Sequence, residues 1–149
     1  MSKIARAARL ASRHRMETIS ASKIIQSAET GETYLIDHNA ASELEITLPA
    51  KQDGAYFKFI FKTDFTAAGT VVITSAEGVN GDFAGSIFEQ ITGGSNADSA
   101  VQLCASHHKL TINDDIDIGS YVECVCDGSV WYFTGHLSVS AVGLAVFGT

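Results

Sequence analysis

Apolar and polar side chains alternate with a period of two along much of the chain, and this alternation predicts β-strands. It is clearest in residues 44–49 and 55–62, where every second position is a leucine, isoleucine or phenylalanine. Successive side chains of a strand point to opposite faces, so one row of each strand should enter the core and the other should face solvent. We therefore expect Phe57, Phe59 and Phe61 to be core residues rather than a ligand-binding shelf.

The stretch 119–136 predicts a β-hairpin. Two runs rich in Val, Tyr and Phe flank the dipeptide Asp127-Gly128. Asp-Gly between such runs favours a tight turn, because glycine supplies the positive φ that the turn needs. The only tryptophan, Trp131, lies in the returning strand, where a large aromatic side chain usually fills a core between sheets.

Further strands are predicted from short apolar and β-branched runs bounded by turn residues, at 23–27, 33–37, 70–74, 101–105 and 110–112. Two other stretches have a different character. Residues 76–99 are rich in Gly, Asn, Ser and Asp, which predicts a long exposed loop with one or two short strands. The nearly uncharged tail 137–149 predicts either a central strand of a sheet or a segment shared with a neighbouring subunit.

These elements together predict an all-β fold, a single β-sandwich, of which a jelly roll is one form. The composition agrees, because only 18% of the 149 residues are charged and the chain is 46% hydrophobic. A chain of this length forms one domain with a sizeable core.

The N-terminal segment 1–23 differs from the rest of the chain in charge and in predicted structure. Its six basic residues and one acid give +5, whereas four lysines and sixteen acids give −12 in residues 24–149; the whole chain is −7. Ala, Arg and Leu dominate residues 1–19 and predict a helix, whose shallow apolar side needs a docking surface. We therefore divide the chain into a basic N-terminal helical arm, 1–23, and a β-sandwich body, 24–149.

Three interpretations of the arm are open: a solvated terminus, a transit peptide or nucleic-acid-binding segment, and docking on an acidic protein surface. We favour docking, because arginine forks suit carboxylates at interfaces and the acidic body offers no basic surface to extend a nucleic-acid footprint. We expect no nucleic-acid partner. We also expect no membrane partner, because Ser and Gly interrupt the longest apolar run. The candidate partner-binding residues are Lys3, Arg6, Arg9, Arg13 and Arg15.

Possible metal ligands in the chain lack the usual spacing of a metal site. Cys104, His107, His108, Cys124 and Cys126 could converge on zinc if their strands were neighbours, but the sequence has no C-x-x-C pair. Buried, reduced cysteines are the default for such an arrangement.

The remaining candidate chemistry is weaker still. The aspartates at 114, 115 and 117 resemble a calcium loop only loosely, since the required Gly and Glu do not follow. No nucleophile elbow, phosphate-binding loop or dinucleotide fingerprint is present in the sequence. We therefore expect no metal, no cofactor and no enzymatic activity.

Two stretches resemble virion proteins of tailed phages. Gly31-Glu-Thr-Tyr-Leu-Ile-Asp37, followed by Leu44-Glu-Ile-Thr-Leu-Pro49, resembles an opening in which a G-x-x-Y/F-x-L-D strand precedes one ending in x-T-L-P. Asp127-Gly-Ser-Val-Trp-Tyr-Phe-Thr-Gly135 resembles the D-G-x-x-W-Y-x-x-G hairpin that closes the same modules, and Val71-Val-Ile-Thr74 takes the place of a V-T-I strand between them. The resemblance covers residues 31–135, so the basic arm lies outside it.

Such modules occur in capsid decoration (cement) proteins, head fibres and tail-associated proteins, so the resemblance implies assembly rather than catalysis. The expected function is that of a decoration protein made in the host cytoplasm and bound to the outer capsid surface of the virion. Its expected partners are the major capsid protein and sister subunits in a homotrimer. The alternative is a tail, baseplate or head-fibre adhesion module, whose contacts the loop 76–99 would carry.

Overall fold

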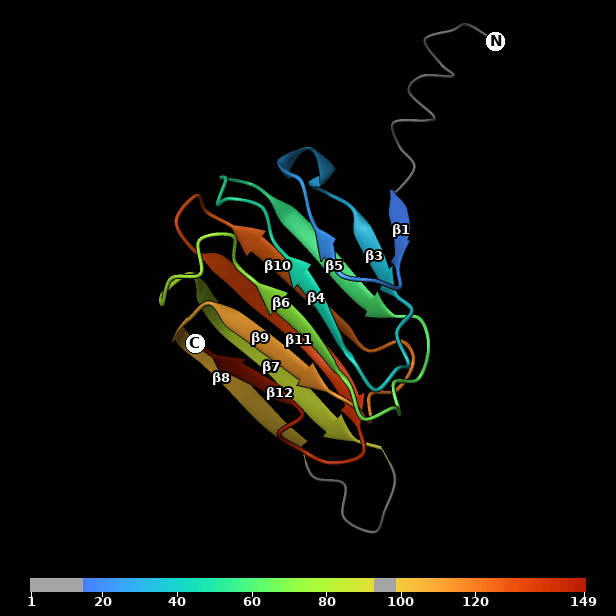
Figure 1. The fold of residues 1–149 in the computed structure, drawn as a ribbon. Coiled ribbons are helices and arrows are strands. Elements are labelled where there is room, and N and C mark those ends of the chain that lie inside the picture. Colours follow the sequence, from blue (N-terminus) through green and yellow to red (C-terminus); the bar gives the residue numbers. More distant parts are fainter. Residues whose placement is uncertain (1–14, 93–98) are drawn as a thin grey trace, which may run out of the picture.

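Two β-sheets packed face to face make up the protein (Figure 1). The computed structural model describes residues 15–92 and 99–149. The seven-stranded sheet contains, in spatial order, β1 (Met16–Ile19), β3 (Thr33–Ile36), β5 (Tyr56–Phe61), β10 (Tyr121–Cys126), β11 (Trp131–Val139), β7 (Phe83–Ile91) and β8 (Ser99–His107). The five-stranded sheet contains β12 (Ala145–Gly148), β9 (Lys109–Asn113), β6 (Thr70–Thr74), β4 (Glu43–Thr47) and β2 (Lys23–Ile24). One short 3-10 helix, η1 (Ser27–Glu29), precedes β3. The predicted β-sandwich is confirmed.

The order of the strands explains an unusual share of parallel pairs. From β1 to β7, each strand lies in the opposite sheet from the one before it. A chain that crosses to the other sheet and returns lays its next strand parallel to the last one in the same sheet. The pairs β1–β3, β3–β5, β2–β4 and β4–β6 are parallel for this reason. A jelly roll is built from antiparallel strands, so the sandwich differs from that form.

The predicted core residues are buried between the two sheets. Phe57, Phe59 and Phe61 point inward from β5, and Trp131 points inward from β11. The rings of Phe57 and Trp131 lie 5.8 Å apart between centroids. Burying a large apolar side chain contributes about 1.5–3 kcal/mol, so this aromatic layer is a main source of stability. The prediction of a phenylalanine core row is confirmed.

The predicted hairpin is also confirmed, and it lies in the middle of the larger sheet as β10 and β11. Cys126 pairs with Trp131, which leaves a four-residue loop. The Asp127 carboxylate accepts hydrogen bonds from the backbone N–H groups of Ser129 and Val130, both at 2.8 Å. Gly128 has φ +88°, the conformation for which the Asp-Gly signal calls.

The helix predicted over residues 1–19 is wrong for its last part, because Met16–Ile19 is strand β1. This strand pairs in parallel with β3, and Ile19 enters the core. Weak helix propensity is readily overridden when the backbone can complete a sheet and bury a side chain. With β2 in the smaller sheet, part of the segment assigned to the arm belongs to the sandwich. Residues 1–14 lie outside the described part of the chain.

The long loop predicted at 76–99 is wrong over Phe83–Ile91, which forms the nine-residue strand β7. Gly85 contributed to the loop prediction, but its role is a close approach between strands. Its φ is +122°, and a Cβ atom at this position would lie 2.0 Å from the carbonyl oxygen of Phe133 on β11. Only glycine allows the backbones to come this near.

The apolar tail 137–149 is divided between two elements. Its first residues extend β11 to Val139 inside the larger sheet, whereas Ala145–Gly148 forms β12 at the edge of the smaller sheet. The central-strand interpretation is therefore wrong for β12, which pairs only with β9 in the described structure. No helix in the described part of the chain has the length and apolar composition needed to cross a bilayer.

Candidate interaction surface

Of the predicted arm residues, Arg15 is the one that falls within the described structure, where it leads into β1. Its side chain is 69% exposed, and Nη1 lies 3.8 Å from Glu32 Oε1. Its carbonyl oxygen accepts a 2.9 Å hydrogen bond from the backbone N–H of Thr33. Lys3, Arg6, Arg9 and Arg13 lie outside the described residues. The chain thus enters the sandwich at the β1 edge of the larger sheet.

A cluster of charged side chains closes the sandwich beside this edge, between β1 and β2. The Lys23 ammonium lies 2.8 Å from Glu29 Oε1 and 3.1 Å from Glu17 Oε2. Hydrogen bonding to Glu29, aided by Glu17, raises the pKa of Lys23 above its ordinary value. Burial alone would raise the pKa of Glu29, but hydrogen bonds from the Gln26 backbone and from Lys23 outweigh it, so this pKa lies lower than usual.

The same cluster is where the described residues come nearest to a metal site. Carboxylate oxygens of Glu17, Glu29 and Glu32 all lie within 4.8 Å of one another. Oxygen ligands of this kind suit hard cations such as Ca²⁺. However, the Lys23 ammonium already supplies a positive charge to two of the three carboxylates. We therefore interpret the group as an internal ion-pair cluster that fastens β1 to β2.

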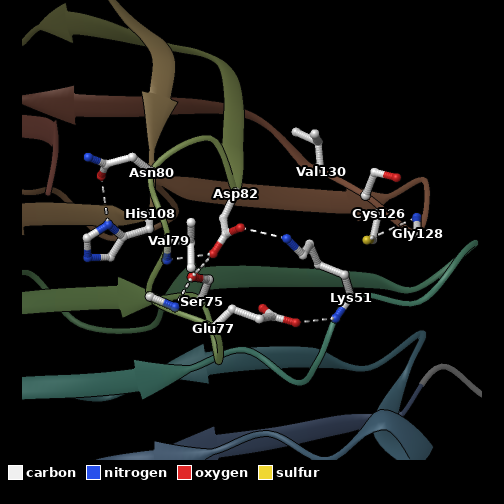
Figure 2. Close-up of polar contacts among 12 residues, drawn as sticks. Lys51, Ser75, Glu77, Val79, Asn80, Asp82, His108, Cys126, Gly128 and Val130 are labelled. Atoms are coloured by element: carbon white, nitrogen blue, oxygen red, sulfur yellow. Dashed lines mark hydrogen bonds and ion pairs between the residues drawn. The ribbon is translucent and has the colours of Figure 1, made fainter.

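A second polar cluster surrounds Asp82, just before β7 (Figure 2). The Asp82 carboxylate is buried and receives hydrogen bonds from Lys51 Nζ and Ser75 Oγ, both at 2.6 Å, and from the backbone N–H of Val79 at 3.0 Å. The Ser75 hydroxyl also accepts a 3.0 Å hydrogen bond from the backbone N–H of Gly78. The cluster joins three segments: the turn before β5, the end of β6 and the start of β7.

The ionisation of this second cluster favours a structural role over a catalytic one. Burial alone would raise the pKa of Asp82, but the hydrogen bonds from Lys51, Ser75 and Val79 outweigh it and leave this pKa below its usual range. The hydrogen bond to Asp82 raises the pKa of Lys51. Lys51 is therefore a cation and Ser75 donates its proton to an anion, so neither is set up as a base or an activated nucleophile. The arrangement acts as a clamp between strands.

The residues considered as zinc ligands are spread over the larger sheet and its margin. Cys104 lies on β8, whereas Cys124 and Cys126 lie on β10, with β11 and β7 between the two strands. All three thiols are buried and unpaired with one another. Burial raises the pKa of the Cys124 thiol, which disfavours the thiolate that a metal would need. His108 binds the Asn80 side chain instead, with Nδ1 3.1 Å from Oδ1.

A third feature is the outer surface of β11, β7 and β8, which we call the neutral surface. Strand pairing places the following side chains on one face: Ala84, Ser86 and Phe88 of β7, Val101, Leu103 and Ala105 of β8, and Tyr132, Thr134 and His136 of β11. Neither Asp, Glu, Lys nor Arg is among them. The one acidic residue of the three strands, Glu89, points inward and is buried.

Large apolar side chains of the neutral surface are open to solvent. Leu103 is 74% exposed, Val101 is 56% exposed and Phe88 is 38% exposed. Gathered apolar residues on a strand-rich face mark interaction sites more often than single exposed residues do. The sequence carried a signal for this surface, because residues 99–105 contain no charged side chain although Val101 and Leu103 alternate with smaller or polar residues. The glycine-rich stretch before them masked that signal.

Comparison of the chain with protein-family models, with curated proteins and with solved structures finds no match. The physical features of the sandwich therefore carry the functional interpretation: a charged entry edge at β1, saturated polar clusters, and an uncharged apolar surface around β8.

Proposed function

We propose that the protein is a capsid decoration protein of a tailed phage, which binds the outside of the shell and stabilises it by bridging capsomers. The observation that supports the proposal is that two surface features of different character, one basic and one uncharged, lie at opposite edges of one sheet. The basic arm joins the sandwich at β1, and the neutral surface surrounds β8 at the other edge. A protein with two separate attachments can bridge two partners. The partners we propose are the major capsid protein and sister subunits in a homotrimer.

Electrostatics supports a division of labour between the two features. The arm segment 1–23 carries +5, and its arginines suit an acidic protein surface through bidentate contacts with carboxylates. The neutral surface suits a contact driven by apolar burial. Residues Lys3, Arg6, Arg9, Arg13 and Arg15 would bind the shell in this scheme. The resemblance of residues 31–135 to phage virion modules points to the same kind of particle.

An adhesion module of a tail, baseplate or head fibre is the alternative role. Its support came from a long loop at 76–99 that could carry contacts with a host surface. Because β7 occupies Phe83–Ile91, much of that stretch is part of the sheet. The number of copies per particle separates the two roles, since decoration requires hundreds of copies and a tail position requires a handful.

Deleting residues 2–14 tests the decoration role. The deletion stops before Arg15, because β1 and the buried Ile19 belong to the sandwich. We expect the truncated protein to keep its circular dichroism spectrum and thermal unfolding midpoint but to lose co-sedimentation with shells. Full-strength binding of the truncated protein to shells would overturn the role of the arm.

A length-matched control separates the arm's charge from its length. The full chain with Arg6→Gln, Arg9→Gln and Arg13→Gln keeps the length of the arm but loses three positive charges. We expect binding to shells to weaken for this variant, and the binding of the wild type to weaken as salt is added. Binding that is insensitive to both changes would contradict an electrostatic contact with the shell.

A further inference from the structure

We propose that the edge strand β8, with the neutral surface beside it, binds a second copy of this chain. This surface would provide the contact between sister subunits that the proposed function includes. The inference rests on self-association alone and does not require binding to a capsid. Three observations carry it: the length of the β8 edge, the exposure of its side chains and the distribution of charge over the protein.

The β8 edge is the least protected of the four sheet edges in residues 15–92 and 99–149. The other edge strands are short: β1 and β12 have four residues each and β2 has two. β8 has nine residues, contains no proline and no Asp, Glu, Lys or Arg, and pairs only with β7 in the described structure. Natural sheets blunt free edges by shortness, charge, proline or bulges, since an open edge invites another strand.

One protective irregularity is present, at the end of β8. The pairing with β7 shifts register between Phe83 and Ala84, and Ser106 has φ +71° opposite this shift. A bulge of this kind bends the strand and blocks pairing locally. It leaves residues 99–105 as a regular, unprotected edge.

The regular part of the edge, residues 99–105, exposes large apolar side chains. Val101 and Leu103 are more than half exposed and point to the outer face, where Phe88 of β7 lies opposite Val101. Together they form a continuous apolar strip along the edge. Such a strip is typical of a contact between subunits.

The charge distribution identifies the partner as another copy. Residues 24–149 carry −12, so two copies that approach by most surfaces bring like charges together. The outward side chains of β11, β7 and β8 present no carboxylate, so copies can meet there without this repulsion. A basic partner would find no counter-charge on the surface and would be drawn elsewhere on the protein. For an acidic protein with one uncharged, apolar edge, a second copy is therefore the partner that this edge favours.

Two geometries place the free edge against a sister copy. Two β8 strands that meet edge to edge form an isologous contact, which closes as a dimer. If β8 of one copy packs against β7 and β11 of the next, the contact is heterologous and a ring of three can close. In the edge-to-edge contact Leu103 lies next to the partner strand, and in the heterologous contact it is covered by the neighbouring copy.

Leu103→Lys tests the proposal, with the mass of the purified protein in solution as the measurement. We expect the wild type to sediment as a dimer or trimer, and the variant to dissociate with a Kd at least about 100-fold higher, because leucines at the contact are replaced by like charges that face one another or lose water. Ile118→Lys is the matched control, since Ile118 is 62% exposed in a loop outside the neutral surface. It should leave the assembly unchanged.

Three results would overturn self-association through β8. They are a monomeric wild type at high micromolar concentration, an unchanged Kd for Leu103→Lys, and an equal loss for Ile118→Lys. If Leu103→Lys does not fold, amide hydrogen exchange of the wild type provides the test instead: peptides from 99–107 must gain protection as the concentration rises. Shell binding is measured in a separate experiment with arm-deleted protein, whereas self-association is measured on the purified protein alone. A negative result for shell binding therefore leaves the result for self-association unaffected.

Discussion

At one open side of the sandwich, between β1 and β2, Lys23 holds the carboxylates of Glu17 and Glu29. At the other side, near β8 and β12, the buried carboxylate of Glu89 has no basic partner among residues 15–92 and 99–149. It accepts hydrogen bonds from Gln102 Nε2 at 2.9 Å and from the backbone N–H groups of Gly143 and Ala145, both at 2.6 Å. Both sides are tied across the two sheets, the first by ion pairs near solvent and the second by hydrogen bonds inside the core.

The difference has consequences for stability and for association. Partly exposed ion pairs contribute little and are screened by salt, but their charges keep other strands away from the β1 edge. The β8 side gains more from its buried contacts, including the rings of Phe83 and Phe133, whose centroids are 4.6 Å apart. However, it leaves an edge without charges. The side that is better fastened internally is thus the one that is open to a partner.

Removing the Glu89 carboxylate should have the largest effect on folding. Glu89→Ala leaves the buried N–H group of Ala145 and its neighbours without an acceptor, and each unpaired buried donor costs about 1–3 kcal/mol. We expect the free energy of unfolding in urea to fall by about 3 kcal/mol in total. Glu89→Gln keeps one acceptor oxygen and should lose clearly less. Equal losses for both variants would contradict a hydrogen-bonding role for the carboxylate.

Adding one methyl group at Gly85 should have the next largest effect, since it forces β7 away from β11. We expect Gly85→Ala to lower the unfolding free energy by about 2 kcal/mol, within the range for overpacking. Gly31→Ala, at the charged side, is the matched control: φ there is +86°, but no atom lies within 4 Å of the added Cβ. Backbone strain alone should cost the control about 1 kcal/mol. A Gly85→Ala variant no less stable than Gly31→Ala would show that β7 and β11 separate freely.

Breaking the ion pairs of Lys23 should have the smallest effect, and its size should depend on pH and salt. We expect Lys23→Met to lower the unfolding free energy by about 1 kcal/mol or less at neutral pH in low salt. The pKa of Glu29 lies below its usual 4.5, so its contribution is present above that pH and is lost as the pH falls through the lowered pKa. The pKa of Lys23 lies above its usual 10.5, so its contribution is lost as the pH rises through the raised value.

The measurement is the difference in unfolding free energy between wild type and Lys23→Met, followed over pH and salt. We expect this difference to be constant near neutral pH and to decline on the acid side. It should also be smaller in 1 M salt, where the Debye length is about 3 Å and the ion pair is screened. The Glu89→Ala loss should not change with salt, because its partners are uncharged donors inside the protein. A salt-independent Lys23 effect would remove the contrast between the two sides.

Much of the local structure could be predicted from the sequence, for identifiable reasons. The alternation in residues 55–62, the β-branched run 70–74 and the Asp127-Gly128 turn specify strands and a hairpin by local rules, and the structure contains them. The errors lie where a distant partner decides. Gly85 looks like a turn residue until Phe133 is seen beside it, and Met16–Ile19 looks helical until β3 offers it hydrogen bonds.

The sequence by itself determined that this protein is a β-sandwich with a phenylalanine and tryptophan core, because period-two alternation and turn residues act within a few positions. It also determined the contrast between a basic N-terminus and an acidic body, since charge depends on composition alone. Only the tertiary structure decided which strands became edges, because alternation states which face of a strand is buried but not which strand lies beside it. The exposed β8 edge, the inward Glu89 and the parallel pairs all follow from that choice of neighbours.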